Sequence, residues 1–502
     1  MIKRTATTSS TSHRHESSTT PVDGALFNSR YATLASNTID YWMLPEDPDI
    51  TESQILRAIE EAPVLEDASL QIYIHVPFCA QSCRFCAFSG GNSLNFSEGQ
   101  RYASLVVTQL RDLLDRMQIK GRRIRSVNVG GGSPDLLNGH IGHVLRAVRD
   151  LPGCQDDTEI SVEFTLSTTK RVFIEELVRY GVTKASFGVQ SVDPTVREHM
   201  RQPRSLKHLD QVLRWIDGRI PIVNADLITG MPGQTIQIVE TDLRAMMNDP
   251  RINCVSSYVL TRGAAPSLIA GLESGDLPEL PKPAQHAQMR LHTYGTLLRE
   301  GWTRRGTNSY FNPKRIDPEV LEMVAGNECI GGSHYEAFLL GVGPQAISSL
   351  PGVRVENRVD IDGWCRAMER GDHPFHLRNC STRHQRDIAL WAFPLRWEGL
   401  PQHRWDRMQA AGAISSRQIQ VLKELQQEGL IVHTNRGYEL SILGEVFMGH
   451  IVRDLKSDEG RKAVDDYIAE GERLGRVMAE GAIRDTNEAN NRQIALPLLR
   501  EP

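Results

Sequence analysis

Six apolar, strand-like runs alternate with helical patterns between residues 72 and 260, and this alternation constrains the fold more than any other feature of the chain. The strand-like runs cover residues 72–76, 124–129, 160–164, 183–189, 222–228 and 255–260. The helical patterns between them cover residues 102–117, 143–151, 170–180, 206–216 and 237–247. Such alternation is typical of βα units, whose strands pair in parallel. The sequence therefore predicts an α/β fold built on a parallel sheet.

Three cysteines follow the first strand-like run. Cys79, Cys83 and Cys86 are separated by three and then two residues. Cysteine thiolates are the usual ligands of iron–sulfur clusters, and three of them leave one iron of a four-iron cube without a protein ligand. That iron is free to bind a small molecule. The spacing therefore indicates a reactive centre and not simple electron storage.

Two other roles for these cysteines agree less well with the sequence. A structural zinc site normally takes four protein ligands, and His75, the nearest candidate, lies within a strand-like run. Disulfides belong to oxidising compartments, whereas residues 1–28 are polar and carry no apolar signal stretch. The other cysteines lack metal-ligand spacing, and we expect them to be inert thiols: Cys154, Cys254, Cys329, Cys365 and Cys380.

The composition excludes some classes of partner. Of the 502 residues, 40% are hydrophobic, and no apolar run is long enough to span a membrane. The formal net charge is −5, which provides no overall basic field for nucleic acid. We therefore expect a cytoplasmic protein that binds neither a membrane nor nucleic acid.

The cysteine spacing resembles the signature of the radical S-adenosylmethionine (SAM) superfamily. Further blocks are similar to its HemN-like branch, named after oxygen-independent coproporphyrinogen III oxidase: Tyr73-x-His-x-Pro-Phe-Cys, Gly130–Pro134, Glu163, Ser186–Ser191 and Asp226–Thr235. The resemblance implies a partial (β/α)6 radical SAM barrel with a C-terminal HemN-type mixed α/β domain of winged-helix-like character. It also implies a four-iron, four-sulfur (4Fe-4S) cluster on Cys79, Cys83 and Cys86, with SAM at the open iron.

The resemblance also implies cofactor contacts, for two SAM molecules in all. Contacts to the SAM on the cluster are implied for Tyr73, Gly131, Glu163 and Ile347. Contacts to a second SAM are implied for Phe85, Gly132, Ser133, Gln190, Asp226 and Val259. Glu163, Gln190 and Asp226 lie near the ends of strand-like runs, where a parallel barrel builds its site. For any one of these three, the alternative is a helix cap or an internally bonded polar group.

We expect five segments along the chain. They are a disordered tail (1–28), an N-terminal approach segment with a helix near 53–62 (29–69), the barrel with a pocket-closing segment (70–350), the HemN-type C-terminal domain (351–459), and a C-terminal helix and tail (460–502). Within the fourth segment, residues 418–444 have the pattern of a helix, a strand, a turn and a strand. Its mixed charges favour covering a substrate over binding DNA.

Departures from the HemN pattern bear on the function. Ala87-Phe88-Ser89 follows Cys86 where coproporphyrinogen oxidases have Gly-Cys-Asn, and Lys184 replaces a family arginine. Another family arginine falls on Gln202, with Arg201 one residue earlier, which implies either a small shift or a changed contact. These changes favour a class C radical SAM methyltransferase or cyclopropanase acting on an unsaturated carbon of a natural product or similar small molecule. The alternatives are an oxygen-independent coproporphyrinogen III oxidase and a haem-binding or trafficking protein. The implied partners are a small-molecule substrate and an electron donor such as flavodoxin or ferredoxin.

Overall fold

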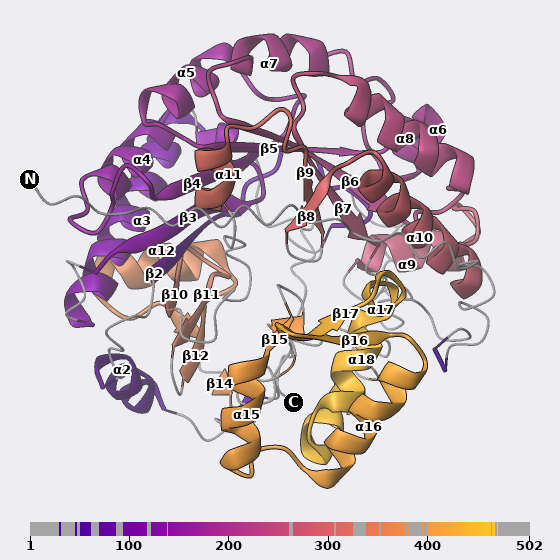
Figure 1. Cartoon of the computed structure of the whole chain (residues 1–502). Coiled ribbons are helices and arrows are strands. Elements are labelled where there is room, and N and C mark those ends of the chain that lie inside the picture. The colour runs from indigo at the N-terminus through magenta and orange to yellow at the C-terminus, as the bar shows by residue number, and fades with distance from the viewer. Residues whose placement is uncertain are drawn as a thin grey trace, which may run out of the picture.

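The computed structural model describes most of the chain between residues 51 and 466 (Figure 1). The described residues are 30–31, 46–47, 51–61, 70–86, 94–117, 122–137, 139–260, 265–305, 308–324, 338–350, 353–376, 379–380, 391, 394–395, 399–462, 464–466 and 469. The tail expected over 1–28, and nearly all of the helix and tail expected over 460–502, lie outside them.

A run of parallel strands forms the centre of the fold, as predicted. These strands are β2 (Leu70–Val76), β3 (Ile124–Gly131), β4 (Glu159–Phe164), β5 (Lys184–Gln190), β6 (Ile222–Thr229) and β7 (Cys254–Val259). They pair in chain order, and each lies within two residues of a predicted run. The α/β fold and the partial barrel are therefore confirmed.

Further strands extend this sheet on both sides, so that it has twelve strands within the described residues. Beside β2 lies the parallel strand β10 (Phe338–Val342), followed by antiparallel β11 (Ile347–Leu350), β12 (Val353–Asn357) and β13 (Phe375–His376). Beside β7 lie β9 (Ser309–Phe311) and β8 (Thr303–Arg305). The main sheet thus continues past residue 350, where we expected the barrel segment to end.

Helices cover the outer face of the sheet, and they arch around the strands in Figure 1. Those that match predicted patterns are α3 (Phe96–Arg116), α4 (Ile141–Arg149), α5 (Arg171–Arg179), α7 (Leu209–Ile216) and α8 (Ile236–Asn248). The others are α2 (Glu52–Glu60), near the expected N-terminal helix, η1 (Pro134–Leu137), α6 (Pro194–His199), α9 (Pro266–Glu273), α10 (Pro283–Arg299), α11 (Pro318–Val324) and α12 (Ile361–Arg370). The apolar stripes of α3, α4, α5, α7 and α8 pack on strand residues such as Ile74, Val129 and Val162. Helices α6 and α9 share a separate apolar cluster, and α11 lies on the inner face.

The inner face of the sheet has an apolar floor below a polar layer. Ile222, Cys254 and Phe311 form a separate apolar cluster with Ile316, against which α11 packs. Lys184 on β5 is the register partner of Ile222 in this floor. Two residues further along the two strands, Ser186 on β5 is the register partner of Asn224 on β6. Because side chains two residues apart in a strand share a face, these polar groups lie on the same inner face, towards the carboxyl ends of the strands.

The C-terminal part of the chain forms a second, smaller unit opposite the arch of helices (Figure 1). It contains β15 (Leu400–Pro401), α15 (Gln402–Ala410), α16 (Ser416–Gln427), β16 (Ile431–Thr434), β17 (Gly437–Leu440), α17 (Ile442–Val446) and α18 (Met448–Leu455). Its three strands pair in the order β15, β17, β16. The predicted sequence of helix, strand, turn and strand is thus present in α16, β16 and β17. A separate pair of short strands is β1 (Glu46–Asp47) with β14 (Asn379–Cys380).

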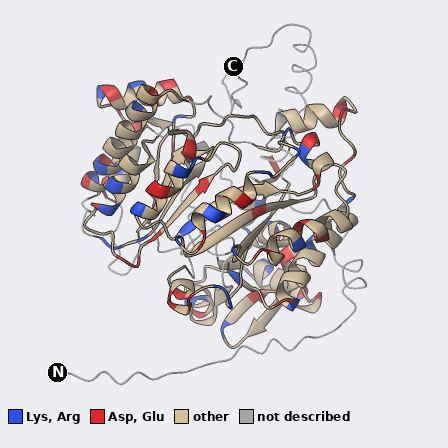
Figure 2. Ribbon diagram, turned by 90° about the horizontal axis from the view of Figure 1, so that it is seen from above, with Lys and Arg blue, Asp and Glu red and all other residues tan. Residues whose placement is uncertain are grey.

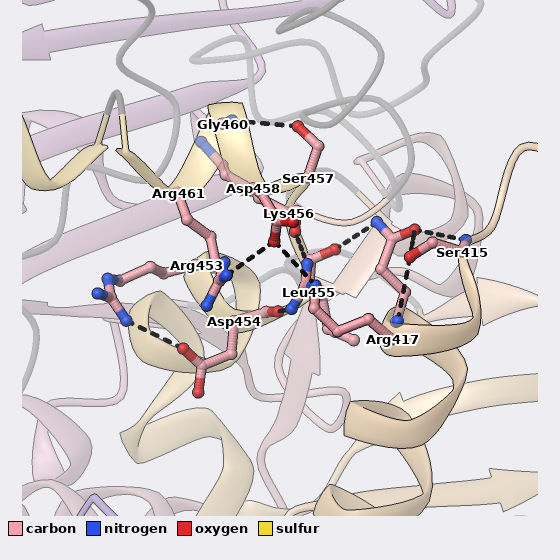
Figure 3. Close-up of polar contacts among 11 residues, drawn as sticks. Ser415, Arg417, Arg453, Asp454, Leu455, Lys456, Ser457, Asp458, Gly460 and Arg461 are labelled. Atoms are coloured by element: carbon pink, nitrogen blue, oxygen red, sulfur yellow. Dashed lines mark hydrogen bonds and ion pairs between the residues drawn. The ribbon is translucent and has the colours of Figure 1, made fainter.

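The end of α18 is held by the start of α16 (Figure 3). Arg417 donates to the Asp454 carbonyl at 2.8 Å and to that of Lys456, and Gln418 donates to the Leu455 carbonyl at 2.7 Å. The last carbonyls of a helix have no partner within that helix. Side chains from α16 therefore satisfy them and join the two helices.

Charges of both signs are spread over the surface helices (Figure 2). Many of them form short-range pairs along one helix, such as Arg116 with Asp112 and Arg244 with Glu240. Exposed pairs of this kind each contribute little to stability. Within the described part of the chain, no helix is long and apolar enough to cross a membrane.

Candidate active site

The three cysteines lie in the loop after β2, and all three are partly buried. The Cys86 N–H donates to the Cys83 carbonyl at 3.2 Å, which brings these two residues together. Burial raises the pKa of the Cys79 thiol to about 12 and that of Cys83 to about 11, and the nearby Cys86 adds to both increases. The three sulfur atoms therefore lie within electrostatic reach of one another.

The glycine loop at the end of β3 packs against the cysteine loop. The Gly132 N–H donates to the Val76 carbonyl and the Ser133 N–H to the Phe78 carbonyl, both at 2.7 Å. A Cβ atom on Gly132 would lie 2.5 Å from the Phe78 carbonyl oxygen. Gly131 has a φ of +106°, a conformation that favours glycine. Glycine at these positions thus allows the two loops to approach closely.

Ser133 is buried, and its hydroxyl is already bonded within the protein. It donates to Asp135, lies 2.8 Å from the Thr165 hydroxyl and accepts the Thr165 N–H at 3.1 Å. These bonds tie the loop after β3 to the end of β4. The Ser133 side chain, for which the resemblance implies a cofactor contact, thus also holds these two segments together.

Glu163 projects from β4 into the polar layer. The Asn128 side-chain amide donates to its carboxylate at 3.2 Å, and a Cβ atom on Gly130 would lie 2.5 Å from that carboxylate. Burial raises the pKa of Glu163, while Asn128, the Gly131 N–H and the charge of Lys184 act in the opposite direction. The absence of a side chain at Gly130 leaves space for the carboxylate.

Asp226 is the second carboxylate of this layer, two strands away on β6. The Asn224 amide donates to it at 2.7 Å and the Ser186 hydroxyl at 3.1 Å. Burial and, to a smaller extent, the charge of Glu163 raise the pKa of Asp226 to about 7, while Lys184 acts in the opposite direction. The two carboxylates thus lie close enough to repel each other, and Lys184 reduces that repulsion.

Lys184 lies below both carboxylates, at the start of β5. Its register partners are Ser161 on β4 and Ile222 on β6. Its Nζ lies 5.8 Å from the centre of the Phe311 ring, a distance at which a cation is attracted to an aromatic face. The lysine that departs from the family pattern is therefore a charged member of the inner layer.

Gln190 folds back over its own strand at an irregularity in the sheet. The register between β5 and β6 shifts between Gly188 and Gln190, and Gln190 has a φ of +66°. A Cβ atom on Gly188 would meet the Gln190 side-chain nitrogen, and Gly188 is the register partner of Asp226. Bulges often redirect a side chain beside an active site. Here the Gln190 amide lies back over Gly188 of its own strand, next to the strand that carries Asp226.

The remaining residues predicted to contact SAM lie on strands to either side of β4 and β6, or in the cysteine loop. On β2, the Tyr73 hydroxyl lies 2.9 Å from Nδ1 of His75, whose pKa burial lowers to about 4. Ile347 begins β11, and its backbone closely approaches Gly341 of β10. At the other side, Val259 ends β7 and is partly buried. Phe85 packs on an apolar cluster that contains Met200, Met231 and Leu260.

Known proteins resemble the chain both in sequence and in structure. Residues 73–246 match the radical SAM superfamily. An anaerobilin synthase of Escherichia coli O157:H7 is 25% identical over 326 residues, which cover 62% of this chain and 69% of that protein. An oxygen-independent coproporphyrinogen III oxidase of Escherichia coli K12 is 22% identical over 421 residues, which cover 80% of this chain and 88% of that protein.

A solved structure supports the same fold. The HemN coproporphyrinogen III oxidase of Escherichia coli superposes with a TM-score of 0.66 at 19% identity, covering 84% of this chain and 100% of that one. The chain carries a HemN-like radical SAM domain. The cofactors of this family are a 4Fe-4S cluster and SAM.

The cysteine loop of the radical SAM domain fits a 4Fe-4S cluster. Its donors are three neighbouring thiols, and cations in contact with a buried thiol deprotonate it. Among the described residues, no group of three His, Cys, Asp or Glu side chains is arranged to hold a single metal ion. A four-iron cube does not require its ligands to converge on a single metal ion, because each cysteine binds a different iron. Cys79, Cys83 and Cys86 would hold the cluster in this loop.

The strand order sorts the predicted SAM contacts of the radical SAM domain into two halves. The first set, Tyr73, Gly131, Glu163 and Ile347, lies on β2, β3, β4 and β11. In the second set, Gln190, Asp226 and Val259 lie on the adjoining strands β5, β6 and β7. The other members of the second set lie outside that half: Gly132 and Ser133 follow β3, and Phe85 lies in the cysteine loop. Each half has one carboxylate, Glu163 or Asp226.

Sequence reasoning missed several polar partners in the radical SAM domain. Asn128, Ser186 and Asn224 bond the two carboxylates, and Lys184 was noted only as a departure from the family. A two-residue period was their signal, because Lys184 and Ser186, like Asn224 and Asp226, alternate with apolar residues. That pattern identifies one face of a strand, but not whether the face is the inner one.

Proposed function

We propose that this protein is a class C, HemN-like radical SAM methyltransferase or cyclopropanase acting on an unsaturated carbon of a small molecule. One observation carries the proposal: Gln190, Asp226 and Val259 of the second predicted set lie on strands that adjoin those of the first set, and each group of strands has its own carboxylate. Glu163 belongs to β2–β4 and Asp226 to β5–β7. An enzyme that uses two SAM molecules at once needs two such sites side by side.

The residues of each half have distinct tasks in this proposal. When bound, the reduced cluster and its SAM supply a 5′-deoxyadenosyl radical, and the second SAM supplies the transferred carbon. Glu163 accepts hydrogen bonds from the amino or ribose groups of the first SAM, and Asp226 and Gln190 hold the second. Lys184 keeps the pair of carboxylates from repelling each other. The reducing electron comes from a donor protein such as a flavodoxin or ferredoxin.

Oxidative decarboxylation is the second candidate function, because several similar proteins are named oxygen-independent coproporphyrinogen III oxidases. Oxygen-independent coproporphyrinogen III oxidases align with up to 80% of this chain at 22% identity. Against it stand Ala87-Phe88-Ser89 after the last cluster cysteine and Gln202 at a family arginine. The two candidates differ in the fate of SAM carbon, since only a methyltransferase or cyclopropanase transfers it to the substrate.

The test follows that carbon. Protein reconstituted with iron and sulfide is incubated anaerobically with dithionite and methyl-labelled SAM, with and without coproporphyrinogen III. We expect both 5′-deoxyadenosine and S-adenosylhomocysteine, with label donated from SAM. Release of carbon dioxide from coproporphyrinogen III without label transfer would establish the decarboxylase instead. A protein that binds haem and leaves SAM intact would establish the trafficking function.

Variants of the two carboxylates add a second comparison. Asp226→Asn and Gln190→Ala should suppress S-adenosylhomocysteine more than 5′-deoxyadenosine, because they leave the first site in place. Glu163→Ala is the matched control and should suppress both products. Loss of one charge-assisted contact costs about 1.5–3 kcal/mol, so SAM affinity at the affected site should fall roughly 10- to 100-fold. Equal loss of both products in all three variants would contradict two separate sites.

A further inference from the structure

The turn that follows α6 packs directly on the cysteine loop. The Arg84 N–H donates to the Met200 carbonyl at 3.1 Å, and the Arg84 side chain donates to the His199 carbonyl at 3.4 Å. The Gln81 side-chain amide donates to the carbonyl of Arg201, which has a φ of +56°. Three backbone carbonyls of one turn thus hold the loop that carries the cysteines.

Gln202 brings a hydrogen-bond donor to one cysteine. Its Nε2 lies 3.8 Å from Sγ of Cys83, and its backbone N–H is fixed by the Arg197 carbonyl at 2.8 Å. Its Oε1 is buried and accepts no hydrogen bond from the described residues. The Gln202 side chain therefore directs its Nε2 donor towards Sγ of Cys83, while its Oε1 acceptor has no hydrogen-bond partner among the described residues.

Arg197 places a buried positive charge within electrostatic reach of the same cysteine. It is 5% exposed, and it donates to the carbonyls of Val189 at 2.5 Å, Ser191 at 3.0 Å and Pro203 at 2.6 Å. These partners are neutral. Two groups of opposite charge act on the guanidinium from nearby, Cys83 when ionised and Asp242 of α8. Asp242 is itself bonded by Ser191 and by the Val192 N–H.

A donor and a cation at a cluster ligand have a defined electrochemical effect. One-electron reduction adds a negative charge to the cluster, and hydrogen bonds to its sulfurs or nearby positive charge stabilise that charge. The effect is large where water is excluded, because electrostatic interactions are stronger there. We propose that Gln202 and Arg197 raise the reduction potential of the cluster through Cys83, with Gln202 as the adjustable contact.

This inference rests on the cluster assignment of the proposed function, though not on whether SAM carbon is transferred. Gln202 and Arg197 are positioning residues here, since they act on a ligand and not on a reacting atom. Gln202 stands where the resembling enzymes carry an arginine, so the described contact to Cys83 gives this position a different task. The electron itself comes from the donor protein, or from dithionite in a titration.

The test is a redox titration of the reconstituted protein without SAM, followed by electron paramagnetic resonance. Gln202→Leu keeps the size of the side chain and removes its donor. We expect the equilibrium constant for reduction to fall about three- to tenfold; tenfold corresponds to 59 mV for one electron. Gln202→Glu should lower it further, because a carboxylate repels the reduced cluster. Gln237→Leu, at an exposed position of α8, is the control and should match the parent.

Iron content separates the possible failures. A parent protein that binds no cluster would overturn the cluster assignment itself. Variants that retain the parent's iron content and the parent's potential would overturn the role of Gln202 alone. A change in SAM affinity with an unchanged potential would show that Gln202 contacts a ligand and would likewise contradict the inference. The expected order of potentials is parent, then Gln202→Leu, then Gln202→Glu, and any other order among loaded proteins contradicts it.

Discussion

The protonation of Asp226 depends strongly on its surroundings. Burial and the charge of Glu163 raise its pKa from 3.8 to about 7. Between these values the folded protein holds a proton that the unfolded chain has released, so the stability contributed by Asp226 is present at low pH and is lost as pH rises towards 7. The ionised Asp226 carboxylate therefore lowers the stability of the folded protein, and it places a negative charge in the site.

Asp226→Asn should therefore stabilise the ligand-free protein at pH 8. The amide cannot ionise, and the gain should be on the order of 1–4 kcal/mol, shrinking to near zero at pH 4. Thermal denaturation of both proteins across this range measures the difference. Asp276→Asn, an exposed position, is the control. A pH-independent difference between parent and Asp226→Asn would contradict the prediction.

The cysteine assignment also makes a prediction at the residue scale. Replacing Cys79, Cys83 and Cys86 together by Ala should abolish cluster binding, because the chain then lacks the three neighbouring thiols. Cys154→Ala and Cys365→Ala should keep about four irons per chain, the content of a cube-type cluster. Iron analysis after anaerobic reconstitution is the measurement. Four irons in the triple variant would disprove the assignment.

At the scale of elements, the contact between the end of β3 and the cysteine loop depends on a missing side chain. A Cβ atom on Gly132 would lie 2.5 Å from the Phe78 carbonyl oxygen and 2.8 Å from that of Val76, and both are backbone atoms that cannot rotate away. The two loops would have to separate. The geometry of the cluster loop thus depends on β3 as well as on its own sequence.

Gly132→Ala should accordingly lower both stability and iron content. Overpacking of this kind costs about 1–3 kcal/mol, and the displaced cysteines should bind less iron per chain. Gly139→Ala is the control: its φ of +86° also disfavours alanine, but no atom lies within 4 Å of the added Cβ. It should lose some stability and retain full iron. Normal iron content in Gly132→Ala would argue against the close packing of the two loops.

At the scale of the whole molecule, a buried arginine joins the barrel to the C-terminal unit. Arg290 of α10 is 3% exposed, and it donates to the Glu445 carbonyl at 2.8 Å and to the Val446 carbonyl at the end of α17. Arg304 of β8 forms an ion pair with the Glu445 side chain. These buried bonds therefore help to fix the C-terminal unit against α10 and β8 of the barrel.

Arg290→Met should loosen the C-terminal unit and leave the barrel folded. The change leaves two buried carbonyls without their donor, which costs about 2–4 kcal/mol. Limited proteolysis should release the C-terminal unit from the variant faster than from the parent, while iron content stays constant. Arg299→Met, at the exposed end of α10, is the control. Equal cleavage rates in variant and parent would contradict this anchoring role.

The sequence by itself determined the local elements and the chemistry of the cysteine loop. Apolar periodicity encodes which residues are buried, so β2–β7 and the helices between them follow from short windows of the chain. Cys79, Cys83 and Cys86 lie within eight residues, and their spacing does not depend on how the rest of the chain folds. The fold class and the family resemblance depend on such local patterns, and both are confirmed.

Only the tertiary structure decided which distant residues meet. Strand order and register bring Glu163, Lys184 and Asp226 to one inner face, and the turn after α6 brings Gln202 to Cys83, 119 residues away in the chain. A two-residue period cannot distinguish the inner face of a sheet from the outer one. Contacts between distant segments depend on sheet closure and loop packing, which are properties of the whole fold and leave no local pattern.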